Sequence, residues 1–438
     1  MQRALLTLTI ATLWLWSFSG KQDETSFASY KAEFIKGYLQ LDVPEVEYDY
    51  RDYFNSIPSA AALEKQATFF REQSSRIQRI DQSKLSLAER TDYEHLLYEL
   101  SFNLYRLELE KAWVTGGRSI PENGLAQMKD HRHWYRYFIK KLTSTDISPE
   151  AVFALGKKEV AKVTNEIEKI RKELLFPDLQ SFYKHLRQDS FYITDKREIV
   201  AGFEKIDSMV RERLPGFAGS FPVPPVYAME WPGAGAHTPP GMYLNHTYTA
   251  YGKDVFQFNF STGRYNRRAM EWLYMHEAIP GHHLQSTISK RTDLQRLFLY
   301  PGNFEGWGCY VEYLGKDFGL YQDPYSYLGK WEWDLVRSAR LVIDAGIHYY
   351  GWTRQEAIEY WKATIPGQDD IAEREITRVT NWCGQALSYK VGADFIMNLK
   401  KEWVEQHKGR STQQFHIDYL QSGVLPLTVL KKQLLSRS

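Results

Sequence analysis

The sequence predicts a mainly α-helical (α+β) protein with two helical lobes and a small antiparallel sheet. Three observations indicate this class. Apolar residues recur at helical spacing from about residue 25 to residue 216, with no internal repeat. Between residues 217 and 263 the chain carries many Pro and Gly residues and short alternating runs, which are typical of strands. After residue 265 the helical spacing returns and continues to the end.

The first twenty residues have the layout of a secretory signal. Arg3 precedes an apolar run from Ala4 to Trp16, and small residues follow. An uncleaved membrane anchor is the alternative, but the run is shorter than the roughly 20 residues that a spanning helix needs. We therefore expect residues 1–20 to be a signal peptide. The mature protein is then exported, periplasmic or secreted, with no stable membrane insertion after cleavage.

The rest of the chain divides into two expected lobes that form one continuous structural unit. Residues 21–215 are expected to be a helical amino-terminal lobe. In it, Ser148 is a good N-cap and Pro149 takes the first position of a long amphipathic helix. Residues 216–438 are expected to be the functional lobe, with strands at residues 243–248 and 255–260 before its helices.

Composition excludes several classes of function. The formal net charge is only +1, from 55 basic and 54 acidic residues, so no overall field favours nucleic acid or an anionic membrane surface. Only two cysteines occur, Cys309 and Cys383, too few for a disulfide framework or a thiolate zinc site. Any bound metal must therefore use histidine and carboxylate ligands.

The stretch MHEAIPGHHLQ contains a possible metal site with unusual spacing. Zinc that activates water needs about three protein ligands and an open position. The candidates are His276 with either His282 or His283. Because Pro280 cannot continue the helical hydrogen bonds and Gly281 is permissive, we expect the helix to widen or break between the histidines. That distortion would let the later histidine return toward the first.

A third candidate ligand lies downstream, in NFEGWGCYVEYLG. Glu305 precedes Gly306 and an apolar helical run, close enough for a neighbouring helix to present it. The string resembles the second helix of the aminopeptidase N-like zinc peptidases, in which the leading glutamate binds the metal. The resemblance assigns that role to Glu305. It implies that Glu312, two turns later on the same face, is a support of the ligands or a substrate contact.

Four ordered motifs resemble the bacterial family catalogued as domain of unknown function number 885, whose members resemble gluzincin metallopeptidases. They are MHEAIPGHHLQ, FEGWGCYVE, RSARLVIDAGIHYYGWTRQEAIEYW and GQALSYKVG. The resemblance implies a zincin-like fold and one Zn²⁺ per chain, held by His276, His282 and Glu305. The family pattern Pro-Gly-His favours His282, and His283 remains the alternative ligand or a structural residue.

The chemistry of amide hydrolysis suggests roles for further residues. Glu277, beside the first ligand, is expected to be the general base, with a plain surface glutamate as the alternative. Charge that develops on the carbonyl oxygen needs a hydrogen-bond donor. Tyr389 is the first choice for this donor and His348 the second.

Other charged residues are candidates for the surroundings of the site. Arg340, Asp344 and His348 are spaced four apart and share one helix face, which predicts a polar network beside the site or a structural Arg340–Asp344 ion pair. Arg378 and Lys390 are candidates to hold a substrate carboxylate, with surface salt bridges as the alternative. The strand-like DVFQFNF can either bind a peptide by edge pairing or pack beneath the helix.

Together these features predict an exported zinc-dependent peptidase of carboxypeptidase or oligopeptidase type, with a peptide as its partner and no nucleic acid. Two other functions stay open. One is a non-catalytic envelope protein that binds peptide or metal, and the other is a metal hydrolase that acts on ester or cell-wall bonds.

Overall fold

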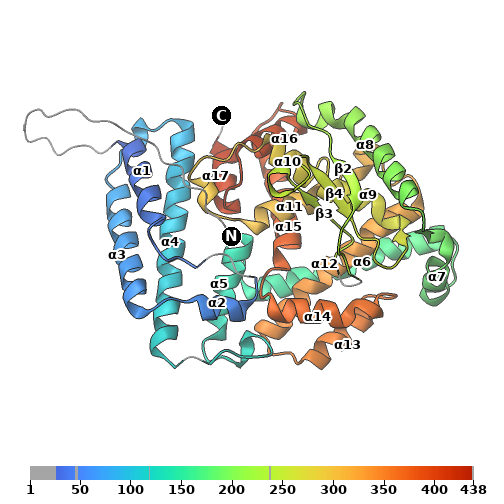
Figure 1. Ribbon diagram of the computed structural model, residues 1–438, viewed down its shortest axis with the longest axis horizontal. Coiled ribbons are helices and arrows are strands. Elements are labelled where there is room, and N and C mark those ends of the chain that lie inside the picture. Colours follow the sequence, from blue (N-terminus) through green and yellow to red (C-terminus); the bar gives the residue numbers. More distant parts are fainter. Residues whose placement is uncertain (1–25, 45–47, 118, 236–237, 437–438) are drawn as a thin grey trace, which may run out of the picture.

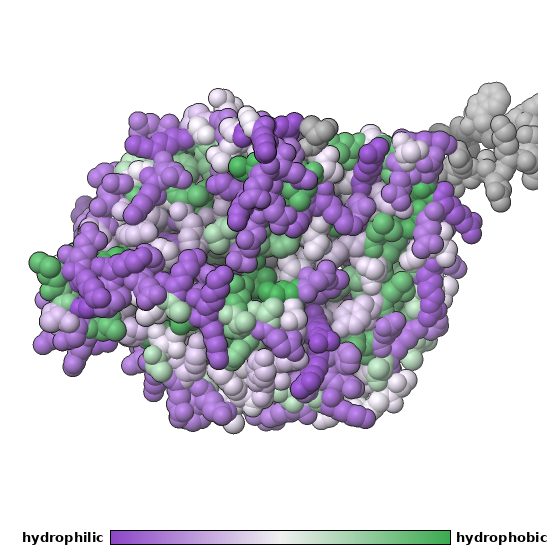
Figure 2. Space-filling model, turned by 180° about the vertical axis from the view of Figure 1, so that it is seen from behind, coloured by the Kyte–Doolittle hydropathy of each residue, from purple (hydrophilic) through white to green (hydrophobic). Residues whose placement is uncertain are grey.

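The computed structural model describes residues 26–44, 48–117, 119–235 and 238–436. The expected signal peptide, residues 1–20, lies outside the described residues. In the described part of the chain, no helix combines the length and the apolar character needed to cross a membrane. The face in Figure 2 is largely hydrophilic, and one group of hydrophobic side chains lies near its centre.

The amino-terminal half is built almost wholly of helices. In Figure 1, α1, α3 and α4 stand side by side at one end of the molecule. The helices of this half are α1 (Phe27–Tyr38), α2 (Tyr50–Ser56), α3 (Ala60–Ile77), α4 (Leu87–Thr115), α5 (His131–Thr143), α6 (Pro149–Glu173), α7 (Leu179–Leu186) and α8 (Lys196–Ala218).

The carboxyl-terminal half holds most of the strands and then returns to helices. Its strands are β2 (Tyr227–Glu230), β3 (Gly241–Leu244), β4 (Val255–Phe258) and β5 (Tyr265–Asn266), and β1 (Tyr192–Ile193) pairs with β5. Its helices are α9 (Met270–Glu277), α10 (His282–Ile288), α11 (Pro301–Glu312), α12 (Pro324–His348), α13 (Arg354–Thr364), α14 (Ala372–Asn381), α15 (Leu387–Gln406), α16 (Thr412–Gln421) and α17 (Leu427–Ser436).

The mainly helical class and the predicted long helix are confirmed. The α6 helix begins at Pro149, and the Ser148 hydroxyl accepts a hydrogen bond from the backbone N–H of Ala151. Gly156 lets α6 pack closely on α12, because a Cβ at that position would lie 2.7 Å from a methyl group of Val342. The lobe boundary expected near residue 215 falls inside α8, which runs on to Ala218, and the division into two lobes stays a prediction.

The small sheet differs in detail from the expectation. Its strand order is β2-β4-β3, with β3 antiparallel and β2 parallel to β4, so the sheet is mixed. The first expected strand ends at Leu244, before a 3-10 turn at His246–Tyr248. Because β4, which carries DVFQFNF, is the central strand, it cannot pair its edge with a peptide, and that expectation is wrong. The outer strands of the sheet are β2 and β3.

Close helix packing sets the position of α11. A Cβ at Gly306 would lie 2.6 Å from the Cα of Gly392 on α15, so the two helices touch through their backbones. The α9 helix also packs against α11, α12 and β3. The parts of the chain that carry MHEAIPGHHLQ, Glu305 and Tyr389 are thereby brought together on neighbouring helices.

Candidate metal centre

The helix that carries the first motif breaks as expected. Ala278 leaves the helical region, with ψ −108°, the Ile279–Pro280 peptide bond is cis, and the chain becomes helical again in α10. Gly281 is required at this bend, because a Cβ there would lie 1.9 Å from the His276 carbonyl oxygen. The bend brings the His282 ring to 4.7 Å from the His276 ring, centroid to centroid, at an interplanar angle of 80°.

Glu305 on α11 faces both of these histidines. Its Oε2 lies 3.4 Å from the His276 Nε2 and 3.6 Å from the His282 Nε2, and the three candidate ligand atoms all lie within 4.8 Å of one another. His283 points elsewhere, with its Nε2 3.4 Å from an oxygen of Asp254. The structure therefore brings His282, and not His283, beside the other two candidate ligands.

Supporting residues orient the His276 ring. Its Nδ1 donates to the Glu312 carboxylate at 2.7 Å, and the Arg337 guanidinium donates to the other oxygen of Glu312 at 2.6 Å. Gly308 makes room for the ring, because a Cβ there would lie 2.6 Å from the ring carbon Cε1. This arrangement leaves Nε2 facing Glu305, as in metal sites whose histidines are held by a carboxylate.

The electrostatics of the cluster favour a bound cation. Burial lowers the pKa of His276, but hydrogen bonding to Cys309, Glu305 and Glu312 raises it well above the usual range. Burial raises the pKa of Glu305, but the adjacent His276 and His282 hold it well below the usual range. The carboxylates thus stabilise positive charge at this point, and a divalent metal ion would supply it.

Glu277 and Tyr389 face the same pocket as the three candidate ligands. The pocket has a volume of about 270 Å³. Glu277 Oε2 accepts a hydrogen bond from the backbone N–H of Tyr243 on β3, at 2.9 Å. The Tyr389 ring lies nearly parallel to the His276 ring, 6.3 Å away, and its hydroxyl accepts a long hydrogen bond from Arg378, at 3.4 Å. Both residues therefore line the pocket that the three candidate ligands line.

His348 does not reach this pocket. Its Nδ1 accepts from the backbone N–H of Leu125 at 3.1 Å, and its Nε2 donates to the Val379 carbonyl at 2.9 Å. Burial lowers its pKa to about 4. Both ring nitrogens are used in backbone hydrogen bonds, so the oxyanion-donor role predicted for His348 is wrong.

The expected Arg340–Asp344 pair does not form either. Arg340 Nε donates to Glu375 on α14 at 2.8 Å, and this arginine does line the pocket. Asp344 accepts from the Tyr135 hydroxyl at 2.8 Å and from the Gly384 N–H at 3.0 Å, and burial raises its pKa to about 7. Arg340 and Asp344 share one helix face but belong to two separate hydrogen-bond networks.

The two candidates for a substrate carboxylate have different surroundings. Lys390 is 1% exposed and donates to Asp334 at 2.6 Å and to Glu159 at 2.9 Å, so the clamp role predicted for Lys390 is wrong. Arg378 lines the pocket, and its Nη2 donates to the neutral Gln385 at 2.9 Å. Among the described residues Arg378 forms no ion pair, so its charge is available to an anion in the pocket.

Arg337 is the supporting residue that the sequence analysis missed. It lies three positions before Arg340, on the same face of α12, and this spacing is the signal that could have pointed to it. The backbone N–H of Tyr243 was missed as well, because strand pairing places it beside Glu277 and no local pattern marks it.

Fold and site together define a mainly helical protein with a cluster of two histidines and a glutamate in the lining of a pocket. Residues 119–434 match the family described as "Bacterial protein of unknown function (DUF885)". The chain belongs to this family. No curated protein matches the chain in sequence.

Two solved structures are similar in fold. One is described as a "putative lipoprotein" from Colwellia psychrerythraea, with 24% identity and a TM-score of 0.65, and the match covers 87% of this chain and 68% of that one. The other is described as a "putative lipoprotein of unknown function" from Shewanella oneidensis, with 17% identity and a TM-score of 0.73, over 94% of this chain and 100% of that one. At these identities the likeness establishes the fold alone.

Proposed function

We propose that the protein is an exported zinc-dependent peptidase that hydrolyses amide bonds. The observation that carries the proposal is the convergence of His276, His282 and Glu305 beside a pocket that also holds Glu277. Two imidazoles and one carboxylate are a common ligand set for catalytic zinc, which keeps a further position open. The resemblance to gluzincins supports a peptidase, and the description of both structural neighbours as a "putative lipoprotein" supports a location in the cell envelope.

The side chains of the pocket suit the proton transfers of amide hydrolysis. A zinc ion bound there would polarise the scissile carbonyl and lower the pKa of a water molecule. Glu277 is held through Oε2 by the Tyr243 N–H, which leaves Oε1 to take a proton from the attacking water and pass it to the leaving amine. The Tyr389 hydroxyl is placed to donate to the carbonyl oxygen as negative charge develops.

The pocket also suits the binding of a peptide main chain and a carboxylate. Gly241 and Tyr243 on β3, an outer strand of the sheet, line it, and an outer strand can pair with an extended peptide through the backbone groups that Glu277 does not already hold. Arg378 is placed to hold a substrate carboxylate, which suits cleavage near a chain end.

Zinc content and turnover of three variants test the proposal. We expect about one zinc per chain in the wild type and in Glu277→Gln, and loss of zinc in Glu305→Ala. Against a peptide library, Glu277→Gln should lose about 10²- to 10⁴-fold in turnover, the usual contribution of a general base. The control is Glu373→Gln, an exposed carboxylate that pairs with Arg354 away from the pocket.

Two results would contradict the proposal. If the wild type takes up no zinc when zinc is offered, a non-catalytic binding protein becomes the better account. If zinc binds but only esters or cell-wall fragments are hydrolysed, the protein acts on a different bond.

A further inference from the structure

A second pocket adjoins the one at the metal centre. The two share Pro240, Trp272 and Trp333 in their walls. The rings of Trp272 and Trp333 stack at 5.3 Å with an interplanar angle of 16°. The two cavities therefore share a wall that includes this aromatic stack.

The second pocket carries an excess of positive charge. Its charged lining residues are four arginines and two carboxylates: Arg187, Arg264, Arg268, Arg374, Glu332 and Asp370. Two of these arginines are already neutralised, Arg268 by Glu332 at 3.0 Å and Arg374 by the nearby Glu375 at 2.7 Å. Arg187 and Arg264 carry the positive charge that is not ion-paired, and the Asp370 carboxylate in the same lining offsets one of these two charges.

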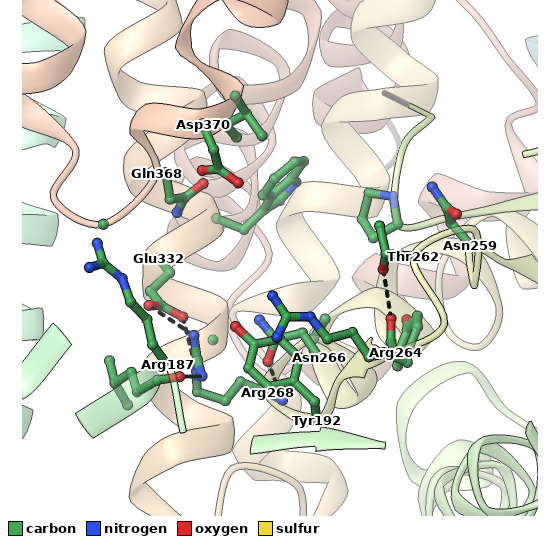
Figure 3. A pocket seen from close by; sticks show the side chains of 18 of the residues that line it. Arg187, Tyr192, Asn259, Thr262, Arg264, Asn266, Arg268, Glu332, Gln368 and Asp370 are labelled. Atoms are coloured by element: carbon green, nitrogen blue, oxygen red, sulfur yellow. Dashed lines mark hydrogen bonds and ion pairs between the residues drawn. The ribbon is translucent and has the colours of Figure 1, made fainter. Parts of the chain in front are cut away.

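Arg187 and Arg264 form no ion pair with any described residue. Figure 3 shows Arg264 extending toward the middle of the pocket, and Arg187 on the side of Glu332. The Arg264 guanidinium lies 4.3 Å from the centre of the Tyr192 ring, a cation–π contact that limits its movement. The chain as a whole has a net charge of only +1, so this local surplus is not a general property of its surface.

Tyr265 in the wall of the second pocket has a buried hydroxyl. It lines the pocket and is 3% exposed, yet its hydroxyl has no hydrogen-bond partner among the described residues. A buried polar group without a partner costs about 1–3 kcal/mol, so native structures rarely keep one. A hydroxyl group can donate to a carboxylate oxygen, and guanidinium groups bind carboxylates in paired hydrogen bonds.

We propose that this second pocket is a substrate subsite for a carboxylate on the peptide that is cleaved at the metal centre. The inference rests on the proposed peptidase function and adds the class of substrate. The substrate is an acidic peptide long enough to cross the Trp272–Trp333 stack, with an Asp or Glu side chain, or its terminal carboxylate, held by Arg187 and Arg264.

A scan of one acidic residue along a peptide tests the subsite. A set of eight-residue peptides carries a single Glu at each position in turn, each with a matched Gln peptide, and all have amidated carboxyl ends. We expect kcat/KM of the wild-type zinc protein to favour Glu over Gln by about tenfold or more at one position, since a hydrogen bond to a charged group contributes about 1.5–3 kcal/mol. A matching peptide with a free carboxyl end tests the terminal carboxylate as the ligand.

Two variants should remove this preference. In Arg187→Gln/Arg264→Gln the preference for the Glu peptide over the Gln peptide should be lost, while the zinc content stays unchanged. Tyr265→Phe should weaken the preference in part, through a higher KM for the Glu peptide. The control is Arg267→Gln, which removes one positive charge from a residue that pairs with Glu198 at 2.8 Å and does not line the pocket.

The outcomes separate this inference from the proposed function. If peptides are cleaved with no preference for a carboxylate at any position, or if the preference survives in the double variant, the subsite is refuted and the peptidase stands. If no peptide is cleaved although zinc is bound, the peptidase proposal fails, and the substrate subsite fails with it.

Discussion

Among the described residues, three groups of metal-ligand side chains have all their ligand atoms within 4.8 Å of one another, and the two groups that share no residue differ in their surroundings. One is His276, His282 and Glu305, and the other is Asp344, His348 and Cys383, with all ligand atoms within 4.8 Å in each group. The first group lies at a pocket, and Glu305 keeps 21% of its side chain exposed. The second group is completely buried.

The hydrogen bonds of the two groups explain the difference. In the buried group both nitrogens of His348 are bonded to the backbone, and both oxygens of Asp344 accept hydrogen bonds. In the open group, which is His276, His282 and Glu305, the Nε2 atoms of both histidines face one oxygen of Glu305. The Nδ1 atom on the far side of the His276 ring is bonded to the supporting carboxylate of Glu312. Proximity of ligand-type residues is therefore a poor sign of a metal site, and uncommitted ligand atoms beside a pocket are a better one.

Matched substitutions in the two groups should have the largest and most distinct effects. His282→Gln is expected to abolish zinc binding, because it removes one of three ligands, while the fold is retained. His348→Gln is expected to keep one zinc per chain and to lower the melting temperature, because the Leu125 N–H loses its acceptor at a cost of about 1–3 kcal/mol. Elemental analysis measures the zinc content of both variants, and thermal unfolding measures their melting temperatures. Equal loss of zinc in the two variants would contradict the assignment of the metal site to the open group alone.

A smaller effect is expected from the residue that supports the open group. Glu312→Gln should weaken zinc binding about 10- to 100-fold, because the Nδ1–H of His276 loses its carboxylate acceptor. Competition with a chelator of known affinity measures the change. The matched control is Glu375→Gln, which breaks another buried pair with an arginine, Arg340, without contact to a histidine. A similar loss of zinc in the control would mean that Glu312 acts only through general stability.

The sequence predicts those features of the fold and of the candidate site that depend on local patterns of residues. Helical spacing predicts the mainly helical class, and Ser148 with Pro149 predicts the start of α6. The break at Pro280 follows from the missing N–H of proline and the freedom of glycine, and the structure confirms it. The resemblance to zinc peptidases singles out Glu305, which the structure places beside His276.

The sequence cannot predict partners that come from distant segments. The four-residue spacing places Arg340, Asp344 and His348 on one helix face, but their partners lie on other elements. His348 bonds to Leu125, 223 positions earlier, and Arg340 pairs with Glu375, 35 positions later. Strand order could not be predicted for the same reason. The alternation of apolar and polar residues indicates that β4 is a strand, but it does not show that β4 lies between two other strands. Tertiary packing decides which candidates reach the pocket.

The smallest expected effect lies in the pH dependence of the buried group. Burial raises the pKa of Asp344 to about 7, from a usual value of 3.8, so the folded protein holds this proton more tightly than the unfolded chain. The resulting stabilisation is present in full below about pH 4 and is lost as the pH rises through about 7. Asp344→Asn has no such proton to lose, and its amide can still accept from Gly384 and donate to the Tyr135 oxygen.

The melting temperature of Asp344→Asn relative to the wild type should therefore rise by a few degrees between pH 5 and pH 8, since each pKa unit is worth about 1.4 kcal/mol. Other titrating groups are common to both proteins and cancel in the difference. The zinc content of the two proteins should be equal at every pH, because Asp344 has no contact with the open group. A temperature difference that does not change with pH would mean that Asp344 keeps its usual pKa and is charged in the folded protein, and the buried group would then be less fully satisfied than its hydrogen bonds indicate.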